Sequence, residues 1–458
     1  MKIIVFGTGQ IYREKKEYIS CNDEVIGFLD NNRKLWGTRI DGVSIYNPEN
    51  ISELYYDKIV LMSNYALEMK EQLLKLNCDK TKILHYLEYI EAQSAGEMKI
   101  LFPLVQKDVS KKNSLIITTD LAYNGGSIAA YYAAIAMQRR GYEPVIATPK
   151  CDTTFCDEIR KSGISVIIYK NLSHAKRNEL FWVNNFQHVL VNTLQMSCCA
   201  VEIAKLRKVN LWIHEPHNLY EVMSYWHEDI QEGIEYKNLK IHAVSSVAKL
   251  NFIKNFKINS MGVLPYGIPD EYTGVEKNEN EKMVFAMIGL ISEQKGQDIF
   301  LRAIEKLSVT EEKLDFLIIG RNLQDTYGKG IEKKIQKYSN IFLLGELSHG
   351  DVMRYWHDID ILVVASREDM LPIVATEAMM LGKVCIMSSE VGTVNYIENF
   401  DNGLIFSSMD PDELMDKIRW CMKYKKELKA IGKSAREVYE NNFSMEIFGE
   451  NLEKMLKQ

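Results

Sequence analysis

Residues 366–383 read Ser-Arg-Glu-Asp-Met-Leu-Pro-Ile-Val-Ala-Thr-Glu-Ala-Met-Met-Leu-Gly-Lys, and they decide the fold class. An apolar strand, 361–365, precedes them, and a second apolar strand, 384–387, follows. Pro372 suits the first position of a helix, where a missing N–H costs nothing, and Gly382 suits the left-handed residue that ends one. The stretch therefore predicts a strand, an acidic loop, a short helix and another strand, which is the repeating unit of an α/β sheet.

The start of this helix predicts an anion site. The first-turn N–H groups of a helix have no partners within it and its dipole is positive there, so a diphosphate can bind beside Pro372. Glu377 lies about one and a half turns further on, where its carboxylate can accept hydrogen bonds from hydroxyl groups of the same ligand. A phosphate-binding helix end beside carboxylates indicates a nucleotide-sugar site, and a solvated loop before an ordinary helix is the alternative interpretation.

Bulk composition limits the class of protein. A length of 458 residues allows two or three domains, each able to bury its own core. The net charge of −6 argues against a nucleic-acid partner. The chain opens on the apolar stretch 3–6, and its eight cysteines form no Cys-x-x-Cys pair, so we expect a cytoplasmic protein with reduced thiols and no leader. No apolar run approaches the roughly 20 residues that cross a bilayer, so any contact with the inner face of the cell membrane is expected to be peripheral.

Strand patterns alternate with helical patterns almost throughout, which predicts α/β units on parallel sheets. Changes in this pattern mark a small Rossmann-like domain over residues 1–95, a linker over 96–112, and two larger domains over 113–267 and 268–458. The linker is expected to be polar, with a short helix.

The first domain carries part of a dinucleotide-binding fingerprint. Gly7 and Gly9 follow a strand, and Asp30 ends the next one, as in folds where the glycines admit a pyrophosphate and the acid binds a ribose. Tyr12 stands at the third glycine position, where it would crowd the packing of helix on strand. We therefore expect a structural or docking role. The segment resembles the small Rossmann-like domains attached to some bacterial sugar-modifying enzymes and polysaccharide glycosyltransferases.

The acidic loop of residues 366–383 resembles the Glu-x7-Glu signature of retaining GT-B glycosyltransferases of the GT4 type (group 1), in the branch written Ser-Arg-Glu-Asp-Pro-Phe-Pro. Eight residues separate Glu368 from Glu377 and seven separate Asp369 from Glu377, so either acid can fill the first family position. The resemblance implies that the neighbourhood of Glu368 contacts the sugar and that Glu377 binds the ribose, while Leu371 and Pro372 belong to the donor site.

The domain over 113–267 resembles the amino-terminal half of the same family. Gly125 and Gly126 follow the strand 115–119, and a glycine pair at a helix start lets a ligand approach the backbone. His214 ends the strand 211–213, where the family commonly places a histidine that contacts the sugar. A tight turn and a buried, hydrogen-bonded histidine are the alternative interpretations.

The domain over 268–458 resembles the donor-binding half. Lys295 lies in a segment similar to the family's diphosphate loop, although Leu290 stands where the family often has an arginine. Arg321, after the strand 316–320, is the expected second cation. The resemblance covers residues 113–455 and implies a GT-B architecture of two Rossmann-like domains facing a cleft, with the last helix packed back on the first of them.

The resemblance implies a retaining transferase that moves a hexosyl unit from a UDP- or GDP-sugar to a glycan or lipid-linked acceptor, in bacterial surface polysaccharide biosynthesis. The expected catalytic residues are His214, Glu368 and Asp369. No metal or other cofactor is expected, because the Asp-x-Asp over 358–360 precedes its strand instead of ending one. A GT-B-shaped subunit that has lost catalysis is the main alternative, with Leu290 in its favour, and an epimerase or phosphorylase is disfavoured.

Overall fold

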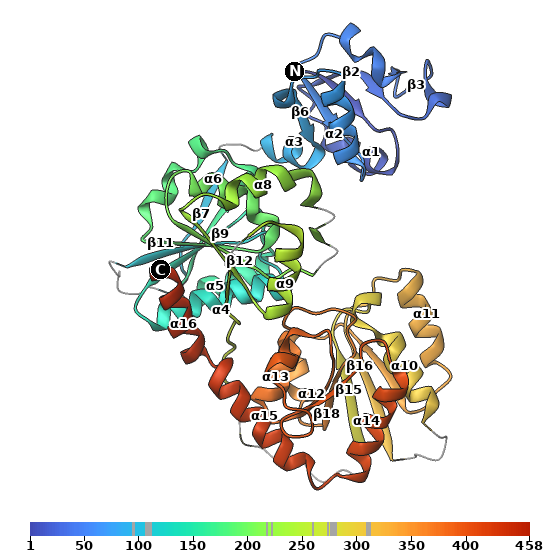
Figure 1. Ribbon diagram of the computed structural model, residues 1–458, viewed down its shortest axis with the longest axis vertical. Coiled ribbons are helices and arrows are strands. Elements are labelled where there is room, and N and C mark those ends of the chain that lie inside the picture. The colour runs from blue at the N-terminus through green and yellow to red at the C-terminus, as the bar shows by residue number, and fades with distance from the viewer. Residues whose placement is uncertain are drawn as a thin grey trace.

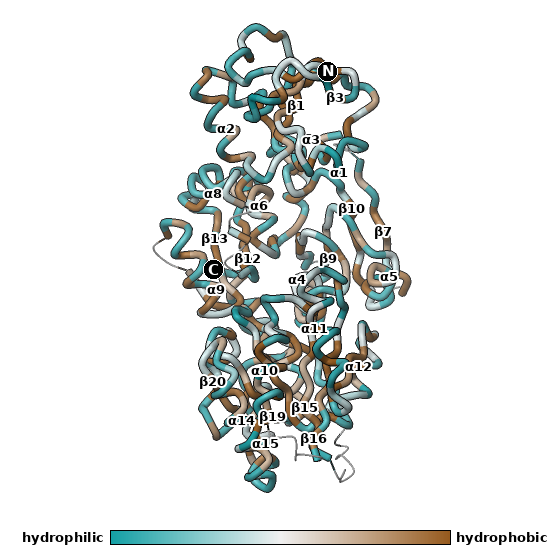
Figure 2. Tube along the Cα trace, turned by 90° about the vertical axis from the view of Figure 1, so that its right-hand side faces the viewer, coloured by the Kyte–Doolittle hydropathy of each residue, from teal (hydrophilic) through white to brown (hydrophobic). Residues whose placement is uncertain are grey.

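The computed structural model describes residues 1–93, 97–105, 112–216, 219–220, 223–258, 261–272, 274, 282–307 and 313–458. These residues form three α/β domains in a row, each built on a mainly parallel sheet (Figure 1). In Figure 2 the hydrophobic colour gathers on strands of the sheets, such as β15, while outer helices such as α14 carry more of the hydrophilic colour. None of the described helices is long and apolar enough to span a bilayer.

The N-terminal domain has a six-stranded sheet in the order β3-β4-β2-β1-β5-β6. Strand β1 lies in the middle because the apolar run Ile3–Phe6 is wholly buried, as a parallel strand covered on both faces requires. The elements are β1 Lys2–Phe6, α1 Gln10–Lys15, β2 Glu24–Leu29, β3 Arg39–Ile40, β4 Val43–Tyr46, β5 Lys58–Leu61, α2 Ala66–Lys75, β6 Ile83–His85 and α3 Tyr86–Ala92.

The glycine loop after β1 is closed onto its own domain. Gly7 has a φ of +106°, and an added β-carbon would lie 2.8 Å from the carbonyl oxygen of Met62, so a larger residue would not fit. Asp30 accepts hydrogen bonds from both the backbone N–H of Thr8, at 3.1 Å, and its hydroxyl, at 2.5 Å. The side chain of Tyr12 packs into the core, where it is 4% exposed. The acid at the end of β2 therefore holds the loop in place.

The middle domain has an eight-stranded sheet in the order β14-β13-β12-β11-β8-β9-β10-β7. Its elements are β7 Met98–Leu101, β8 Asn113–Ile117, α4 Gly125–Arg139, β9 Glu143–Thr148, α5 Thr153–Lys161, β10 Ser165–Tyr169, β11 His188–Asn192, α6 Ser197–Ala204, β12 Val209–Ile213, α8 His227–Ile234, β13 Leu239–Ala243, α9 Ser246–Asn255 and β14 Gly262–Val263.

The segment expected as a linker, 96–112, contributes a strand to this sheet. Residues Met98–Leu101 form β7, which pairs antiparallel with β10, and no helix occurs in the described part of the segment. Ile100 lies opposite Ile167 in the ladder, so an apolar residue of β7 pairs with an apolar residue of β10. Strand β7 thereby covers the otherwise open edge of β10. Residues 96 and 106–111 of the expected linker lie outside the described residues.

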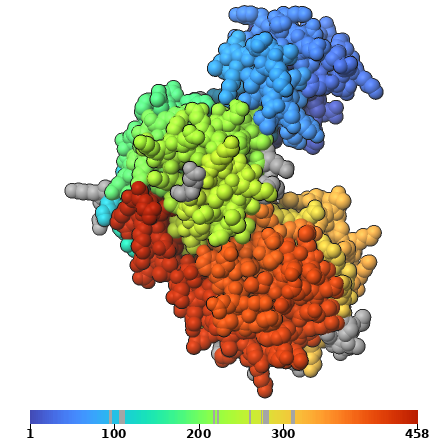
Figure 3. Space-filling model, in the orientation of Figure 1, coloured from blue at the N-terminus to red at the C-terminus, as the bar shows by residue number. Residues whose placement is uncertain are grey.

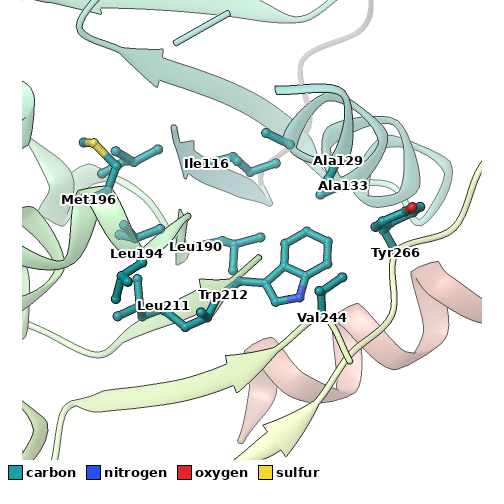
Figure 4. Packing of buried hydrophobic residues seen from close by; sticks show 14 of the residues in the cluster. Ile116, Ala129, Ala133, Leu190, Leu194, Met196, Leu211, Trp212, Val244 and Tyr266 are labelled. Carbon is teal, nitrogen blue, oxygen red and sulfur yellow. The ribbon is translucent and has the colours of Figure 1, made fainter. Parts of the chain in front are cut away.

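The core of the middle domain is centred on Trp212 of β12, which is wholly buried (Figure 4). Its ring lies among aliphatic side chains from the same sheet and from α4, including Ile116, Leu190 and Ala133. The indole N–H donates to the carbonyl oxygen of Leu264 at 2.9 Å, which satisfies the one polar atom of the ring. This core holds the end of β12, and the residues that follow it, in a fixed position.

The C-terminal domain has a six-stranded parallel sheet in the order β17-β16-β15-β18-β19-β20. Its elements are β15 Met283–Ile288, α10 Gln297–Lys306, β16 Leu314–Ile319, α11 Thr326–Ile335, β17 Ile341–Gly345, α12 His349–Tyr355, β18 Ile361–Val364, α13 Ile373–Met380, β19 Val384–Ser388, β20 Leu404–Phe406, α14 Pro411–Lys423, α15 Leu428–Asn442 and α16 Met445–Lys457. The order strand, loop, short helix, strand predicted around residues 366–383 is present. Pro372, however, is the N-cap and not the first helical residue, because its ψ of 126° is extended and the helix begins at Ile373.

The last helix, α16, packs on the middle domain. It lies against α4, where Nε of Arg140 and Oε2 of Glu453 are 2.5 Å apart. Phe448 of the same helix stacks on Trp212 with ring centroids 5.7 Å apart. The chain therefore crosses between the two larger domains twice, once before β15 and once into α16 (Figure 1).

Candidate active site

The strand order of the C-terminal sheet brings two loops together. The chain passes from β15 to β16 and β17 in one direction, then returns to β18 on the other side of β15 and continues to β20. The order reverses between β15 and β18, and ligands of open α/β sheets bind at the carboxyl ends of the strands at such a point. The loop after β15 carries Lys295 and the loop after β18 carries Asp369. Their Nζ and Oδ2 atoms are 2.5 Å apart, so the expected cation and one of the two expected acids meet there.

The Lys295 loop is packed tightly against the end of β18. Gly296, the N-cap of α10, has a φ of +79°, and an added β-carbon would lie 2.1 Å from the carbonyl oxygen of Ala365. Arg367 fastens the two loops further, since its Nη1 and Nη2 donate to the two carboxylate oxygens of Asp298, each at 2.9 Å. This bidentate pair fixes the acidic loop relative to the start of α10.

The two acids that can fill the first family position have different surroundings. Asp369 is 9% exposed and pairs with Lys295, whereas Glu368 is half-buried and reaches the middle domain. There, Nδ2 of Asn251 in α9 donates to Oε1 of Glu368 at 2.6 Å. Glu368 therefore bridges the two large domains, and Asp369 stays within its own domain.

Glu377 has a partner that the sequence analysis missed. Its side chain is 7% exposed, and its Oε1 lies 3.1 Å from Nε2 of His349, the first residue of α12. The hydrogen bond to Glu377 raises the pKa of His349, although burial acts in the opposite direction. His349 follows β17, so its place at the carboxyl edge of a parallel strand was the one signal in the sequence that could have identified it.

The remaining expected donor residues lie around this site. Leu371 and Pro372 are buried at the start of α13, and the carbonyl of Leu371 accepts a hydrogen bond from the hydroxyl of Tyr266. Arg321 is exposed, and its backbone carbonyl accepts a hydrogen bond from Ile291 in the loop that leads to Lys295. In the part of the chain that the structure describes, no carboxylate forms an ion pair with Arg321, which leaves its charge open to an anion.

The middle domain has its own point of strand reversal, between β8 and β11. Gly125 and Gly126 begin α4 directly after β8. Asn192, at the end of β11, donates from Nδ2 to the carbonyl of Gly126 at 2.9 Å. Thr193 follows with a φ of +84°, which is rare for a β-branched residue, and backbone strain of this kind clusters at functional sites. An added β-carbon at Gly125 would meet no atom within 4 Å, so its backbone is open to a ligand.

His214 and Glu215 follow β12, next to β11 in the sheet. Burial lowers the pKa of His214 to about 3, so its imidazole is neutral at neutral pH. Its Nε2 atom is buried and has no hydrogen-bond partner among the described residues. Burial raises the pKa of Glu215 to about 7, and its Oε2 accepts the backbone N–H of His214 at 2.8 Å. A buried polar atom without a partner is costly, which makes Nε2 of His214 a candidate contact for a ligand.

The two halves of the site face each other across the junction of the large domains. Burial and then the nearby charge of Glu377 raise the pKa of Tyr132, which lies on α4 of the middle domain. The Tyr266 contact to Leu371 and the Asn251 contact to Glu368 also cross this junction. The structure thus joins the acidic loop, α13 and the carboxyl edge of the middle sheet in one region (Figure 1).

Comparisons with known proteins found two family models that match parts of the chain. Residues 270–438 match the family model described as glycosyl transferases group 1, and residues 1–84 match a model described as C2185-like, N-terminal. An uncharacterized glycosyltransferase of Methanocaldococcus jannaschii is 28% identical over 217 residues, which are 45% of this chain and 56% of that protein. The chain thus spans little more than half of this relative.

Two further proteins match this chain over more than nine tenths of their own length. The N,N'-diacetylbacillosaminyl-diphospho-undecaprenol alpha-1,3-N-acetylgalactosaminyltransferase of Campylobacter jejuni is 22% identical, over 69% of this chain and 92% of that protein. The crystal structure of Anabaena Alr3699/HepE in complex with UDP and glucose superposes with a TM-score of 0.63 at 14% identity, and covers 75% of this chain and 99% of that one. The shared fold is GT-B.

Proposed function

We propose that the chain is a retaining glycosyltransferase that transfers a hexosyl unit from a nucleotide sugar, supported by the match of residues 270–438 to the group 1 glycosyl transferase model and by the GT-B fold. The observation that carries the proposal is the position of Glu377, a nearly buried carboxylate on a helix whose N-terminus adjoins the Lys295–Asp369 pair. A buried carboxylate beside a cation and a helix N-terminus fits a ligand that presents hydroxyl groups and phosphates together.

The leaving group is the nucleoside diphosphate, whose negative charge grows as the bond to the sugar breaks. The first-turn N–H groups of α13 and the ammonium of Lys295 compensate this charge, and Arg321 adds a second cation. Glu377 binds the ribose hydroxyls, with His349 holding its carboxylate in place. The proposal includes no metal ion or organic cofactor, because these groups supply the positive charge.

The sugar lies toward the middle domain in this proposal. Neutral His214 binds a sugar hydroxyl through Nε2, and the open backbone at Gly125, beside Gly126, admits the donor. Glu368 and Asp369 stabilise positive charge at the anomeric carbon. Asp369 must release part of its contact with Lys295 when the diphosphate binds, because the ammonium then has a competing anion.

The acceptor is proposed by analogy with the relatives. The name of the Campylobacter relative contains a diphospho-undecaprenol, and the Anabaena structure holds UDP and glucose. We therefore propose a glycan or lipid-linked acceptor, a role in surface polysaccharide biosynthesis at the inner face of the membrane, and UDP-sugars as the first donors to test, with GDP-sugars second.

A catalytically inactive subunit is the second candidate, and one observation favours it. Leu290 carries no charge where the family often has an arginine, and Lys295 is already paired with Asp369. Such a protein would bind a donor without turning it over.

Donor binding and turnover with Glu377→Gln test the proposal. Loss of charge-assisted hydrogen bonds to two hydroxyls should weaken donor binding by about tenfold or more, because each is worth about 1.5–3 kcal/mol. Glu437→Gln, on the exposed surface of α15, is the matched control and should bind as the wild type does. Binding of every donor without hydrolysis or transfer would favour the inactive subunit, and absence of binding for all UDP- and GDP-sugars would refute the donor site.

A further inference from the structure

A cavity of about 480 Å³ lies between the N-terminal and middle domains, away from the candidate active site. Its floor on the middle domain comes from α6, α8 and the segment Met223–Trp226, while the candidate active site adjoins α4 and α9 (Figure 1). The N-terminal domain lines it from the other side through β5, β6 and α2. In Figure 3 the blue N-terminal domain lies directly against the green middle domain. Its volume is within the range of about 300–1,000 Å³ that ligand sites occupy, and domain interfaces are frequent places for them.

A buried ammonium lines this cavity. Lys70 of α2 is 6% exposed, and its Nζ donates to the backbone carbonyl oxygen of Tyr225 at 3.2 Å. The same Nζ lies 4.4 Å from the centre of the Tyr225 ring. Among the residues that the structure describes, no carboxylate forms an ion pair with Lys70. An ammonium has three donors, and burying a charge without a counterion is costly. The position of Lys70 therefore fits an anionic group of a ligand.

Both walls of the cavity carry charges of both signs. The N-terminal domain adds Glu88, Lys58, whose Nζ donates to the carbonyl of Thr81 at 2.6 Å, and Lys80, whose Nζ lies 3.5 Å from Oδ1 of Asp229. The middle domain adds the carboxylates of Glu202, Asp229 and Glu232 together with the ammonium groups of Lys176 and Lys205, and Lys205 pairs with Glu202 at 2.7 Å. Carboxylates are acceptors for hydroxyl groups, and lysines bind phosphate as point charges. The cavity thus offers ammonium groups for a phosphate and carboxylates for a polyhydroxylated body.

The indole of Trp226 closes part of the floor, and its faces are already covered by other rings. The ring of Trp226 packs against His85, His174 and Tyr225, with centroids 4.9–5.1 Å apart, and its N–H donates to Glu88 at 3.0 Å. Because these faces are already covered, the cavity favours a compact sugar over a stacked nucleobase.

We infer that this cavity binds a small phosphorylated sugar, with the phosphate at Lys70 and Lys58 and the hydroxyls toward Glu202 and Asp229. The ligand bridges the N-terminal domain and the glycosyltransferase half, so its binding stabilises their contact. The inference does not rest on the proposed transferase activity, since none of the donor-site residues lines the cavity.

Isothermal titration of the full chain with glucose 1-phosphate, galactose 1-phosphate, glucose 6-phosphate, glucose and inorganic phosphate tests the inference. At least one hexose phosphate should bind more tightly than either glucose or phosphate alone. Lys70→Met should weaken this binding by about tenfold or more. The control Lys75→Met, an exposed lysine on the same helix, should not change it.

Glu377→Gln separates this site from the donor site, because it should leave hexose phosphate binding unchanged. Should Lys70→Met fail to fold, Lys58→Met replaces it, since Lys58 is half-buried and is also expected to contact the phosphate. The inference is overturned if no hexose phosphate binds, or if binding survives the lysine substitutions. Binding that is lost in Glu377→Gln, or that inorganic phosphate matches in strength, also overturns it.

Discussion

Replacing Gly296 with alanine perturbs the joint between the Lys295 loop and the end of β18. Gly296 has a φ of +79°, a conformation that costs a residue with a side chain about 1–2 kcal/mol. The new β-carbon would lie 2.1 Å from the carbonyl oxygen of Ala365, which is backbone and must shift. Overpacking of this kind costs typically about 1–3 kcal/mol.

A smaller effect, on the conformational entropy of the unfolded chain, opposes these costs. Alanine restricts the unfolded chain more than glycine does, which stabilises the folded state by about 0.4–1 kcal/mol. Together these contributions should lower the free energy of unfolding of Gly296→Ala by about 2–4 kcal/mol, which corresponds to a fall in Tm on the order of 10 °C for a domain of this size. Because the shift moves Lys295 relative to Asp369, donor affinity should fall as well.

Gly330→Ala is the matched control for the stability measurement. Gly330 is exposed within α11, and an added β-carbon would meet no atom within 4 Å. Alanine is favoured over glycine in a helix by roughly 0.5–1 kcal/mol, so this variant should be slightly more stable than the wild type. Urea unfolding and thermal melts of both variants check the pair. A Gly296→Ala protein as stable as Gly330→Ala would refute the reasoning.

Three further predictions concern the ion pairs and the chemistry. Glu377 raises the pKa of His349 above its ordinary value of 6.5, so the stability from this pair should be fully present below pH 6.5 and lost as pH rises through the raised pKa. Melts of the wild type and His349→Gln from pH 5 to 9 should therefore converge at high pH, and a gap that widens there would contradict the pairing. Hydrogen bonds from Lys457 and Arg140 lower the pKa of Glu453 from 4.5 to about 2, so the stability from this contact should be present above pH 4.5 and lost as pH falls toward 2. Acid unfolding of Glu453→Gln against the wild type measures that loss, and an equal difference at pH 6 and pH 2 would count against it. Sugar transfer should be unchanged by EDTA, assayed with and without added Mg²⁺ or Mn²⁺, and a loss that the metal restores would refute the metal-free proposal.

Local patterns in the sequence predicted the α/β class and the order of elements around the acidic loop. The apolar strands, the glycines after them and the acidic loop at residues 366–383 each lie within a short stretch, so spacing along the chain is enough to recognise them. The order strand, loop, helix, strand around Pro372 is present, with the helix beginning one residue later than expected. The main difference between prediction and structure lies in the linker, where a short helix was expected and strand β7 is found. A four-residue strand such as β7 is recognisable only when the edge of β10 is there to pair with it.

The tertiary structure decided which of these residues contact one another. Lys295 and Asp369 are 74 residues apart and come together only because β15 and β18 are neighbours in the sheet. The His349–Glu377 pair depends in the same way on which strand ends share an edge. The sequence by itself determined the elements and the chemical groups that they carry, since propensity and side-chain pattern act locally. Strand order, domain docking and the cavity beside Lys70 arise from contacts between distant segments, and no spacing along the chain encodes them.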